Sequence, residues 1–143
     1  MAHVRFWAHA VWGTKNRHPY LTGEIRTAVI DHIKSNAENK NIYVYRINGH
    51  LEHLHCLLAL NADMSITKTM QLIKGESSLW INKHKITNLK FEWAEEYFSV
   101  SVSESLLGKV AEYIDNQEEH HKRVTFSEEC ALFMSRYKFQ SQG

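Results

Sequence analysis

The sequence predicts an α+β fold in which helices cover one antiparallel sheet. Apolar residues with strand-like alternation and with helical spacing follow one another in the order β-α-β-β-α-β, and further helical segments come after them. Two of the strand segments are joined through Asn48-Gly49, the strongest short-range signal for a hairpin. The chain has 143 residues, 43% of them hydrophobic, and one proline. This length and composition predict a single domain with its own core.

The first strand and the first helix are predicted within the first 40 residues. A polar and basic loop at 13–19 separates them, since glycine and proline interrupt regular structure there. Thr22 can cap the helix that follows, and the polar run 39–41 ends it. The alternating apolar residues of the strand are Val4, Phe6, Ala8, Ala10 and Trp12, and those of the helix are Ile25, Ala28, Val29, Ile33 and Ala37.

A hairpin and a second helix are predicted in the middle of the chain. Residues 42–47 are rich in β-branched and aromatic side chains, and a second apolar run covers 50–60. The turn at Asn48-Gly49 predicts that these runs pair as antiparallel strands. Ser65 begins the next helix, which has Ile66, Met70, Ile73, Ser77, Trp80 and Ile81 along one side.

The last third of the sequence predicts one more strand and two more helices. The strand lies within 91–102, where Phe98, Val100 and Val102 alternate with serines. Ser103 or Ser105 can cap a third helix, and the spacing Thr125-Phe126-Ser127-Glu128 is typical of a capping box before a short final helix. The core-facing residues of the third helix are Leu107, Val110, Ala111 and Ile114.

The order βαββαβ predicts the ferredoxin-like arrangement, with additional C-terminal helices after it. We expect one domain over residues 1–137 and a short flexible tail at 138–143. This fold supports many unrelated functions, so the function has to come from a site.

Composition restricts the function only weakly. The formal net charge is +1, which gives no strong electrostatic case for a nucleic-acid partner, although a local basic patch remains possible. Cys56 and Cys130 lie in apolar contexts and form no C-x-x-C pair, which suits a reducing compartment. The sequence has no signal-peptide pattern and no apolar run of about 20 residues. We therefore expect a cytoplasmic protein without a membrane partner.

His53-Leu54-His55 is the first candidate site. Side chains alternate along a strand, so both imidazoles point to one side while Leu54 points to the other, into the core. Imidazole nitrogens are good ligands for divalent metals. Alone, such a pair is more often a solvated sheet face than a metal site. Alternation places His50 and Glu52 on the opposite face, so neither is assigned as a ligand.

Tyr113 and Gln117 form the second candidate site. They are four residues apart in a helical pattern and therefore share a helix face, distinct from the apolar stripe. A phenol is a weak nucleophile that needs a metal or a base, and an amide oxygen can complete a metal site. The run 120–123, His-His-Lys-Arg, is interpreted as a solvated basic helix end.

In this order, the features resemble the single-tyrosine HUH transposases of bacterial insertion sequences and their REP-associated relatives. The resemblance includes the HUH motif His53-Leu54-His55, in which leucine is the central hydrophobic residue. It extends over most of the chain, through the segments 12–17, 71–78, 93–101 and 113–121.

The resemblance implies a metal-dependent reaction. His53, His55 and Gln117 would bind Mg²⁺ or Mn²⁺, and Tyr113 would attack the scissile phosphate to form a 5′-phosphotyrosine with a free 3′-OH. Attack by another 3′-OH would then rejoin strands.

The resemblance also implies the partners. These are single-stranded DNA with hairpins at the element ends and a second copy of the chain, with active sites shared between the two subunits. The expected DNA-backbone contacts are Lys15, Arg17, Lys74 and Arg123. Two alternatives stay open: a non-catalytic ferredoxin-like nucleic-acid-binding module, and a phosphodiesterase that uses water, for which Tyr113 would be dispensable.

Overall fold

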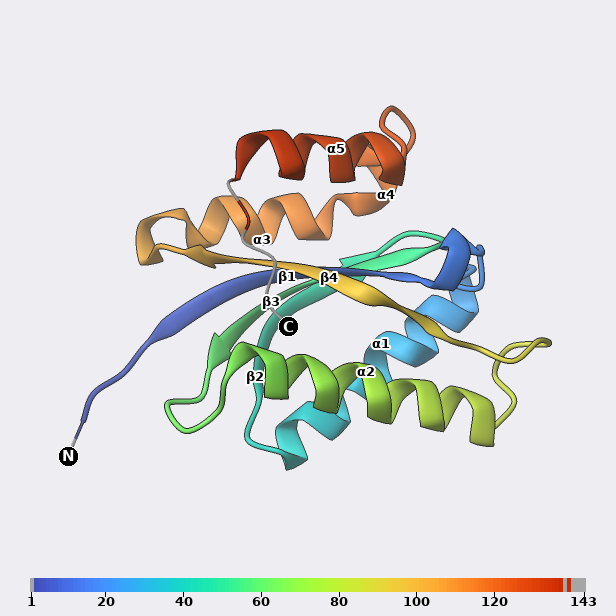
Figure 1. The fold of residues 1–143 in the computed structure, drawn as a ribbon, viewed down its shortest axis with the longest axis horizontal. Helices are drawn as coiled ribbons and strands as arrows, with labels where there is room; N and C mark the ends of the chain where they lie inside the picture. Colours follow the sequence, from blue (N-terminus) through green and yellow to red (C-terminus); the bar gives the residue numbers. More distant parts are fainter. Residues whose placement is uncertain (1, 138, 140–143) are drawn as a thin grey trace.

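The computed structural model describes residues 2–137 and residue 139, which form an antiparallel sheet with helices on both faces (Figure 1). The strands are β1 (Phe6–Thr14), β2 (Tyr43–Gly49), β3 (His53–Leu60) and β4 (Trp93–Val102). The helices are α1 (Gly23–Asn39), α2 (Ile66–Lys83), α3 (Leu107–Asp115), α4 (Gln117–His120) and α5 (Phe126–Arg136), with short 3-10 helices η1 (Lys15–Arg17) and η2 (Glu104–Leu106). The predicted α+β class, the βαββαβ order and the extra C-terminal helices are confirmed. The tail predicted at 138–143 lies outside the described residues, apart from Phe139.

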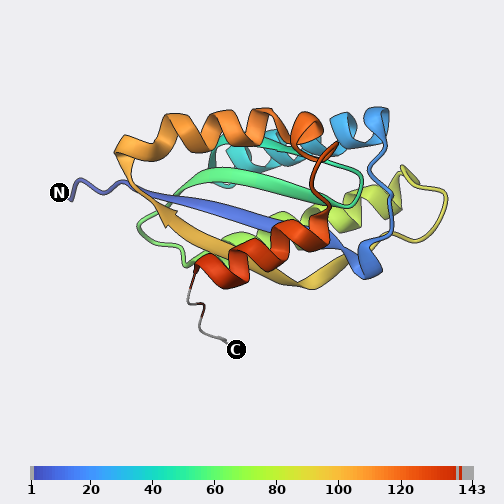
Figure 2. The same cartoon turned by 90° about the horizontal axis from the view of Figure 1, so that it is seen from above.

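The strands lie in the order β2-β3-β1-β4, and every neighbouring pair is antiparallel. The helices α1 and α2 cover one face, and α3, α4 and α5 cover the other (Figure 1). Figure 2 shows that α3 runs above β2 and β3, whereas α5 crosses above β1 and β4. The register of β1 and β3 sets Gly13 opposite His53 and Val11 opposite His55.

The main hydrophobic core lies between the sheet and the helices α1 and α2. Leu54, Cys56 and Leu58 of β3 are fully buried in it, together with alternate residues of β1 such as Ala10 and Trp12. Because strand residues alternate, the intervening residues of β3 face α3 and α5. The predicted orientation of β3 is therefore confirmed.

The predicted turn at Asn48-Gly49 is wrong. Both residues belong to β2, and the connection to β3 is formed by residues 50–52. Asn48 instead donates from its side-chain amide to the carbonyl oxygens of Ile114 and Asp115, at 3.1 and 3.2 Å. These carbonyls belong to the last two residues of α3, where the regular i→i+4 partners of a helix run out. A residue read as a turn signal thus fixes the position at which α3 ends.

The helix starts are confirmed in part. The Ser65 side chain accepts a hydrogen bond from the N–H of Lys68, and the capping box of Thr125 and Glu128 makes both of its hydrogen bonds. Thr22 occupies the N-cap position of α1 but makes no side-chain cap bond. The third predicted helix is interrupted at residue 116, so α3 and the single turn α4 are separate elements.

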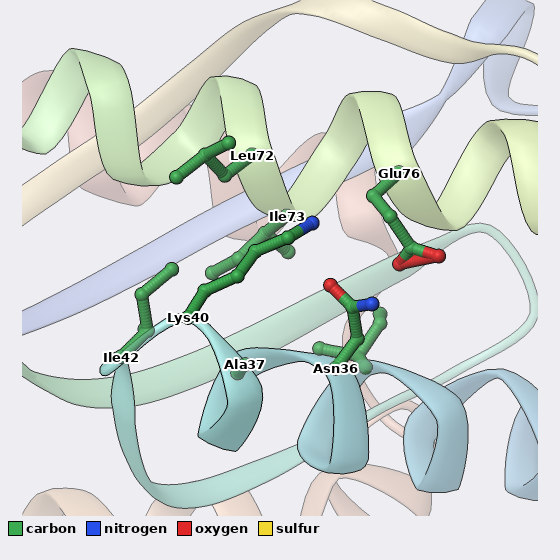
Figure 3. A pocket seen from close by; sticks show the side chains of 8 residues that line it. Asn36, Ala37, Lys40, Ile42, Leu72, Ile73 and Glu76 are labelled. Atoms are coloured by element: carbon green, nitrogen blue, oxygen red, sulfur yellow. The ribbon is translucent and has the colours of Figure 1, made fainter.

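A small hollow lies between α1 and α2, lined by apolar residues and by the polar side chains of Asn36, Lys40 and Glu76 (Figure 3). It is on the face of the sheet opposite His53 and His55, so it takes no part in their chemistry. Among the described residues, no helix combines the length and apolar character needed to cross a membrane.

Candidate active site

The two histidines of the HUH motif are buried in a polar cluster beneath α3, α4 and α5. His53 and His55 are both 0% exposed, so the alternative of a solvated sheet face does not apply. The Nδ1 atom of His53 is 2.8 Å from Oε1 of Glu52, and Nδ1 of His55 is 2.9 Å from Nε2 of His9. The prediction that Glu52 points away is wrong, because Glu52 precedes β3 and strand alternation does not govern its side chain. Both Nε2 atoms are left facing the helices.

The structure brings Gln117 and Tyr113 to this cluster, although they lie on separate helices. Gln117 is 0% exposed, and its Oε1 is 3.2 Å from Nε2 of His53. Tyr113 is half-buried at the end of α3, with its ring centroid 5.6 Å from that of His55. Its hydroxyl donates to Oε2 of Glu129 and lies 3.2 Å from Nε2 of His120.

Glu129 is also a member of the cluster, which the sequence did not indicate. This α5 residue is 1% exposed. Its Oε1 is 3.0 Å from Nε2 of His55 and 3.3 Å from Nε2 of His53, while Oε2 holds the Tyr113 hydroxyl and lies 3.0 Å from Nε2 of His120. One carboxylate therefore connects the histidine pair to the tyrosine. The capping box of Thr125 and Glu128 indicated where α5 begins but not that Glu129 is buried.

The interpretation of 120–123 as a solvated helix end is wrong for its histidines. The side chain of His121 is 2% exposed, with Nδ1 at 2.7 Å from the carbonyl oxygen of Val124. Its Nε2 is 3.0 Å from Oε1 of Gln117 and 3.4 Å from Oε1 of Glu129. The short α4 and the turn after it direct both histidines inward, because α5 folds back over this end of the sheet.

The clustered side chains could hold a metal ion. One ligand atom from each of His53, His55, His121 and Glu129 lies within 4.8 Å of the others, and Oε1 of Gln117 lies beside them. Imidazole nitrogens with carboxylate and amide oxygens are common ligands of divalent first-row metals. The donor set therefore fits a divalent cation.

Burial and the Glu129 charge set the protonation states of the cluster. Burial lowers the pKa of His55 to about 3 and that of His9 to about 4. For Glu129, burial raises the pKa, but contacts with the surrounding histidines outweigh this and hold the pKa well below its usual range. Burial and the hydrogen bond to Glu129 raise the pKa of Tyr113 well above its usual value. Tyr113 is thus a protonated phenol at neutral pH in this arrangement.

The helix α5 forms the cover of the site. The ring of Phe126 stacks on His53 with centroids 4.1 Å apart and an interplanar angle of 4°. Gly13 permits this approach, since a Cβ atom on Gly13 would lie 2.9 Å from Cε2 of Phe126. An open groove on the outer side of α3 and α4 is lined by Tyr113, His120 and Arg123 among others, so Tyr113 borders it.

The four predicted DNA-contacting cations are not gathered in one place. Arg123 lines the groove beside Tyr113, and Arg17 contacts Ser127 and the ring of Phe126 at the start of α5. Lys15 pairs with an exposed carboxylate. Lys74 is on α2, on the other face of the sheet, where its ammonium group donates to two backbone carbonyls of β4 at 2.7 and 3.0 Å. Lys74 is thus separated from the cluster.

The chain is similar to known transposases. The family described as "Transposase IS200 like" matches residues 2–117. The transposase for insertion sequence element IS200 of Salmonella typhimurium is 31% identical over 130 residues, which cover 85% of this chain and 84% of that protein. The ISDra2 transposase TnpA of Deinococcus radiodurans is 25% identical over 115 residues, covering 76% of this chain and 81% of that protein.

Two solved structures share the fold. A putative transposase from Deinococcus radiodurans superimposes with a TM-score of 0.65 at 22% identity, covering 81% of this chain and 93% of the other. A REP-associated tyrosine transposase bound to a REP hairpin has a TM-score of 0.61 at 18% identity, covering 87% of this chain and 73% of the other. The family match extends over most of the chain and ends at Gln117, within the cluster described above. The chain therefore belongs to the IS200-like transposase family.

Proposed function

We propose that this transposase cleaves and rejoins single-stranded DNA at insertion-sequence ends through a covalent bond between Tyr113 and the DNA. The observation that carries the proposal is the position of the Tyr113 hydroxyl, which a shared carboxylate holds beside the buried histidine pair. A phenol beside residues that can bind a metal ion is suited to nucleophilic attack on a phosphodiester.

His53, His55 and Gln117 would hold the metal ion, Mg²⁺ or Mn²⁺. The close approach of Gln117 Oε1 to His53 Nε2 and the burial of all three side chains support this assignment. When bound, the ion supplies a Lewis acid that polarises the scissile phosphate.

Tyr113 would act as the nucleophile. Its oxygen forms a bond to phosphorus, the bond from phosphorus to the 3′ oxygen breaks, and the products are a 5′-phosphotyrosine and a free 3′-OH. The phenolic proton has two acceptors within reach, Oε2 of Glu129 and Nε2 of His120. Attack by a different 3′-OH on the phosphotyrosine joins the strands and releases Tyr113. The phosphodiester energy is retained in the covalent bond, so no nucleotide cofactor is needed.

The proposed substrate is single-stranded DNA with hairpins at the element ends. The REP hairpin bound to the REP-associated relative supports a hairpin ligand. Arg123, beside Tyr113, and Arg17, at the start of α5, are suited to contact the DNA backbone near the site, with Lys15 further along the same loop. Lys74 is the weakest of these assignments because its ammonium group is already bound to β4.

We further propose that the protein acts as a homodimer. The resemblance implies active sites shared between the two subunits, whereas the contacts within one chain favour a site assembled in that chain. The support is that Tyr113, Gln117 and both histidines of a single chain already meet. A mixture of His53→Ala and Tyr113→Phe chains should then remain inactive. Restored cleavage in that mixture would instead indicate that subunits exchange the tyrosine.

The test uses end-labelled single-stranded DNA carrying an element-end hairpin, incubated with the protein and Mg²⁺ or Mn²⁺. We expect a protease-sensitive covalent adduct that Tyr113→Phe abolishes while DNA binding persists. Tyr97→Phe is the matched control, because Tyr97 is on the edge strand β4 and its hydroxyl lies 3.3 Å from the Thr67 hydroxyl on α2. Cleavage that survives Tyr113→Phe would indicate attack by water. Binding without any metal-dependent cleavage would indicate a non-catalytic binding module.

A further inference from the structure

We propose that His121 and Glu129 are also ligands of the metal ion, and that this five-donor site binds Mn²⁺ or another first-row transition ion in preference to Mg²⁺. The inference deepens the proposed function and rests on it for the His53, His55 and Gln117 ligands. It adds two ligands that lie beyond the stretch matched by the family, which ends at Gln117. It also selects between the two ions that the proposed function leaves open.

The first argument comes from the hydrogen bonds of the two sheet histidines. The Nδ1 atom of His53 is bound to the carboxylate of Glu52, which accepts only, so His53 donates there. Nδ1 of His55 is bound to Nε2 of His9. In both rings Nδ1 is occupied, and Nε2 is the atom directed into the cluster. A hydrogen-bonded Nδ1 with a free Nε2 is the arrangement typical of metal-ligating histidines.

His121 repeats this arrangement from outside the sheet. Its Nδ1 donates to the Val124 carbonyl, so the neutral ring has a lone pair on Nε2. That lone pair faces the oxygens of Gln117 and Glu129, at 3.0 and 3.4 Å. A lone pair directed at two acceptor oxygens is unfavourable unless a proton or a cation lies among them. His53 and His121 both present such a nitrogen to the oxygens of Gln117 and Glu129, which favours a cation among them.

The distances between donor atoms agree with this conclusion. Bonds of about 2.0–2.2 Å to a divalent metal place adjacent ligand atoms roughly 3.0–3.4 Å apart, depending on the geometry. The separations of Glu129 Oε1 from Nε2 of His55, His53 and His121 are 3.0, 3.3 and 3.4 Å. The separations of Gln117 Oε1 from His53 and His121 are 3.2 and 3.0 Å. The two oxygens are therefore spaced from these nitrogens as neighbouring ligands of one ion would be.

The chemistry of the donors selects the ion. Three imidazole nitrogens dominate the set, whereas Mg²⁺ prefers oxygen ligands and retains water. Mn²⁺ accepts both nitrogen and oxygen ligands, and Co²⁺ binds such sites more tightly still. The Glu129 carboxylate places a negative charge beside the Nε2 atoms of all three histidines, so its removal should weaken binding of every divalent ion.

The test measures metal binding by the EDTA-stripped full chain without DNA. Titration calorimetry with Mn²⁺, Co²⁺ and Mg²⁺ is combined with the visible spectrum of the Co²⁺ form, which reports the ligand set. We expect Mn²⁺ and Co²⁺ to bind at least about tenfold more tightly than Mg²⁺. Glu129→Gln should weaken Mn²⁺ binding about tenfold or more and change the Co²⁺ spectrum. His121→Asn is the second variant, should Glu129→Gln fail to fold.

Glu128→Gln is the matched control, because Glu128 is the adjacent residue of α5, is exposed, and its capping oxygen is retained in glutamine. If Glu129→Gln and His121→Asn bind metal as Glu128→Gln does, the two added ligands are wrong while the three-ligand site of the proposed function stands. If the unaltered chain prefers Mg²⁺, the ion selection is wrong. If it binds no divalent ion, the metal requirement of the proposed function fails as well. DNA cleavage is measured separately, so its absence would leave the five-donor site intact.

Discussion

His9 should make the fold sensitive to mild acid, and His9→Gln should relieve part of that sensitivity. His9 is on β1 and is 8% exposed; its Nε2 lies 2.9 Å from Nδ1 of His55, and its ring centroid lies 6.2 Å from that of Phe133 on α5. Burial lowers its pKa from 6.5 to about 4, because the charged imidazolium cannot be hydrated there. In the unfolded chain the same ring is solvated and regains its ordinary pKa.

The sign and the magnitude follow from this difference. Between pH 6.5 and 4 the unfolded state binds a proton at His9 that the folded state does not, so the free energy of unfolding falls as the pH falls. A pKa that drops from 6.5 to about 4 corresponds to roughly 3 kcal/mol over the whole interval, or about 1.4 kcal/mol for each pH unit. His55 adds a similar contribution, since burial lowers its pKa to about 3.

The assay is urea unfolding of the EDTA-stripped protein at several pH values between 6.5 and 5. His9→Gln keeps a hydrogen-bonding group for His55 but cannot take up a proton. We expect the unfolding free energy of this variant to fall less steeply with pH, by about 1.4 kcal/mol for each pH unit. Equal slopes for the variant and the unaltered chain would refute the assignment of His9 as a histidine that is buried in its neutral form.

Four further substitutions have defined outcomes. Gly13→Ala should cost about 1–3 kcal/mol in urea unfolding, because its methyl group meets the Phe126 ring at 2.9 Å and must displace it. Asn48→Ala should cost about 1–2 kcal/mol in the same assay, since it removes the donor to the last carbonyls of α3. Arg123→Gln should weaken the binding of single-stranded DNA. It should also lower the slope of the logarithm of the binding constant against the logarithm of the salt concentration by about the amount that one phosphate contact contributes. Lys74→Gln should weaken DNA binding less than Arg123→Gln does and should lower stability, because the Lys74 ammonium group is bound to two carbonyls of β4.

The sequence predicted the half of the site that depends on local periodicity. Alternation along β3 is a property of any strand, so the common orientation of His53 and His55 followed from their spacing, and the apolar identity of Leu54 indicated which side is the core. The four-residue spacing of Tyr113 and Gln117 predicted that they share one side of a helix. Both do lie at the cluster, although the helix is interrupted between them.

The other half depends on contacts that local patterns do not encode. Glu129 meets His55 across 74 residues of sequence, and only the packing of α5 over β1 and β4 brings them together. An acidic residue in the first turn of a helix is explained well enough by the helix dipole, so nothing in the sequence indicated that it is buried. Asn48 was misread for a related reason, since its local turn propensity competes with a tertiary contact to α3 that only the fold reveals.

The histidines on the sheet and Glu129 on α5 also differ in how firmly the fold holds them. The imidazoles of His53 and His55 are on a central strand, and Glu52 and His9 fix their orientation, so the sheet presents both nitrogens with little freedom left. Glu129 approaches them on α5, an eleven-residue helix whose contacts with the site include the Phe126 stacking. Because the same carboxylate holds the hydroxyl of Tyr113, a shift of α5 would loosen the ion and free the nucleophile together. The scissile phosphodiester has to reach both the metal ion and the Tyr113 hydroxyl, and the Glu129 carboxylate lies between these two. We therefore expect α5, and not the sheet, to adjust when DNA enters the site.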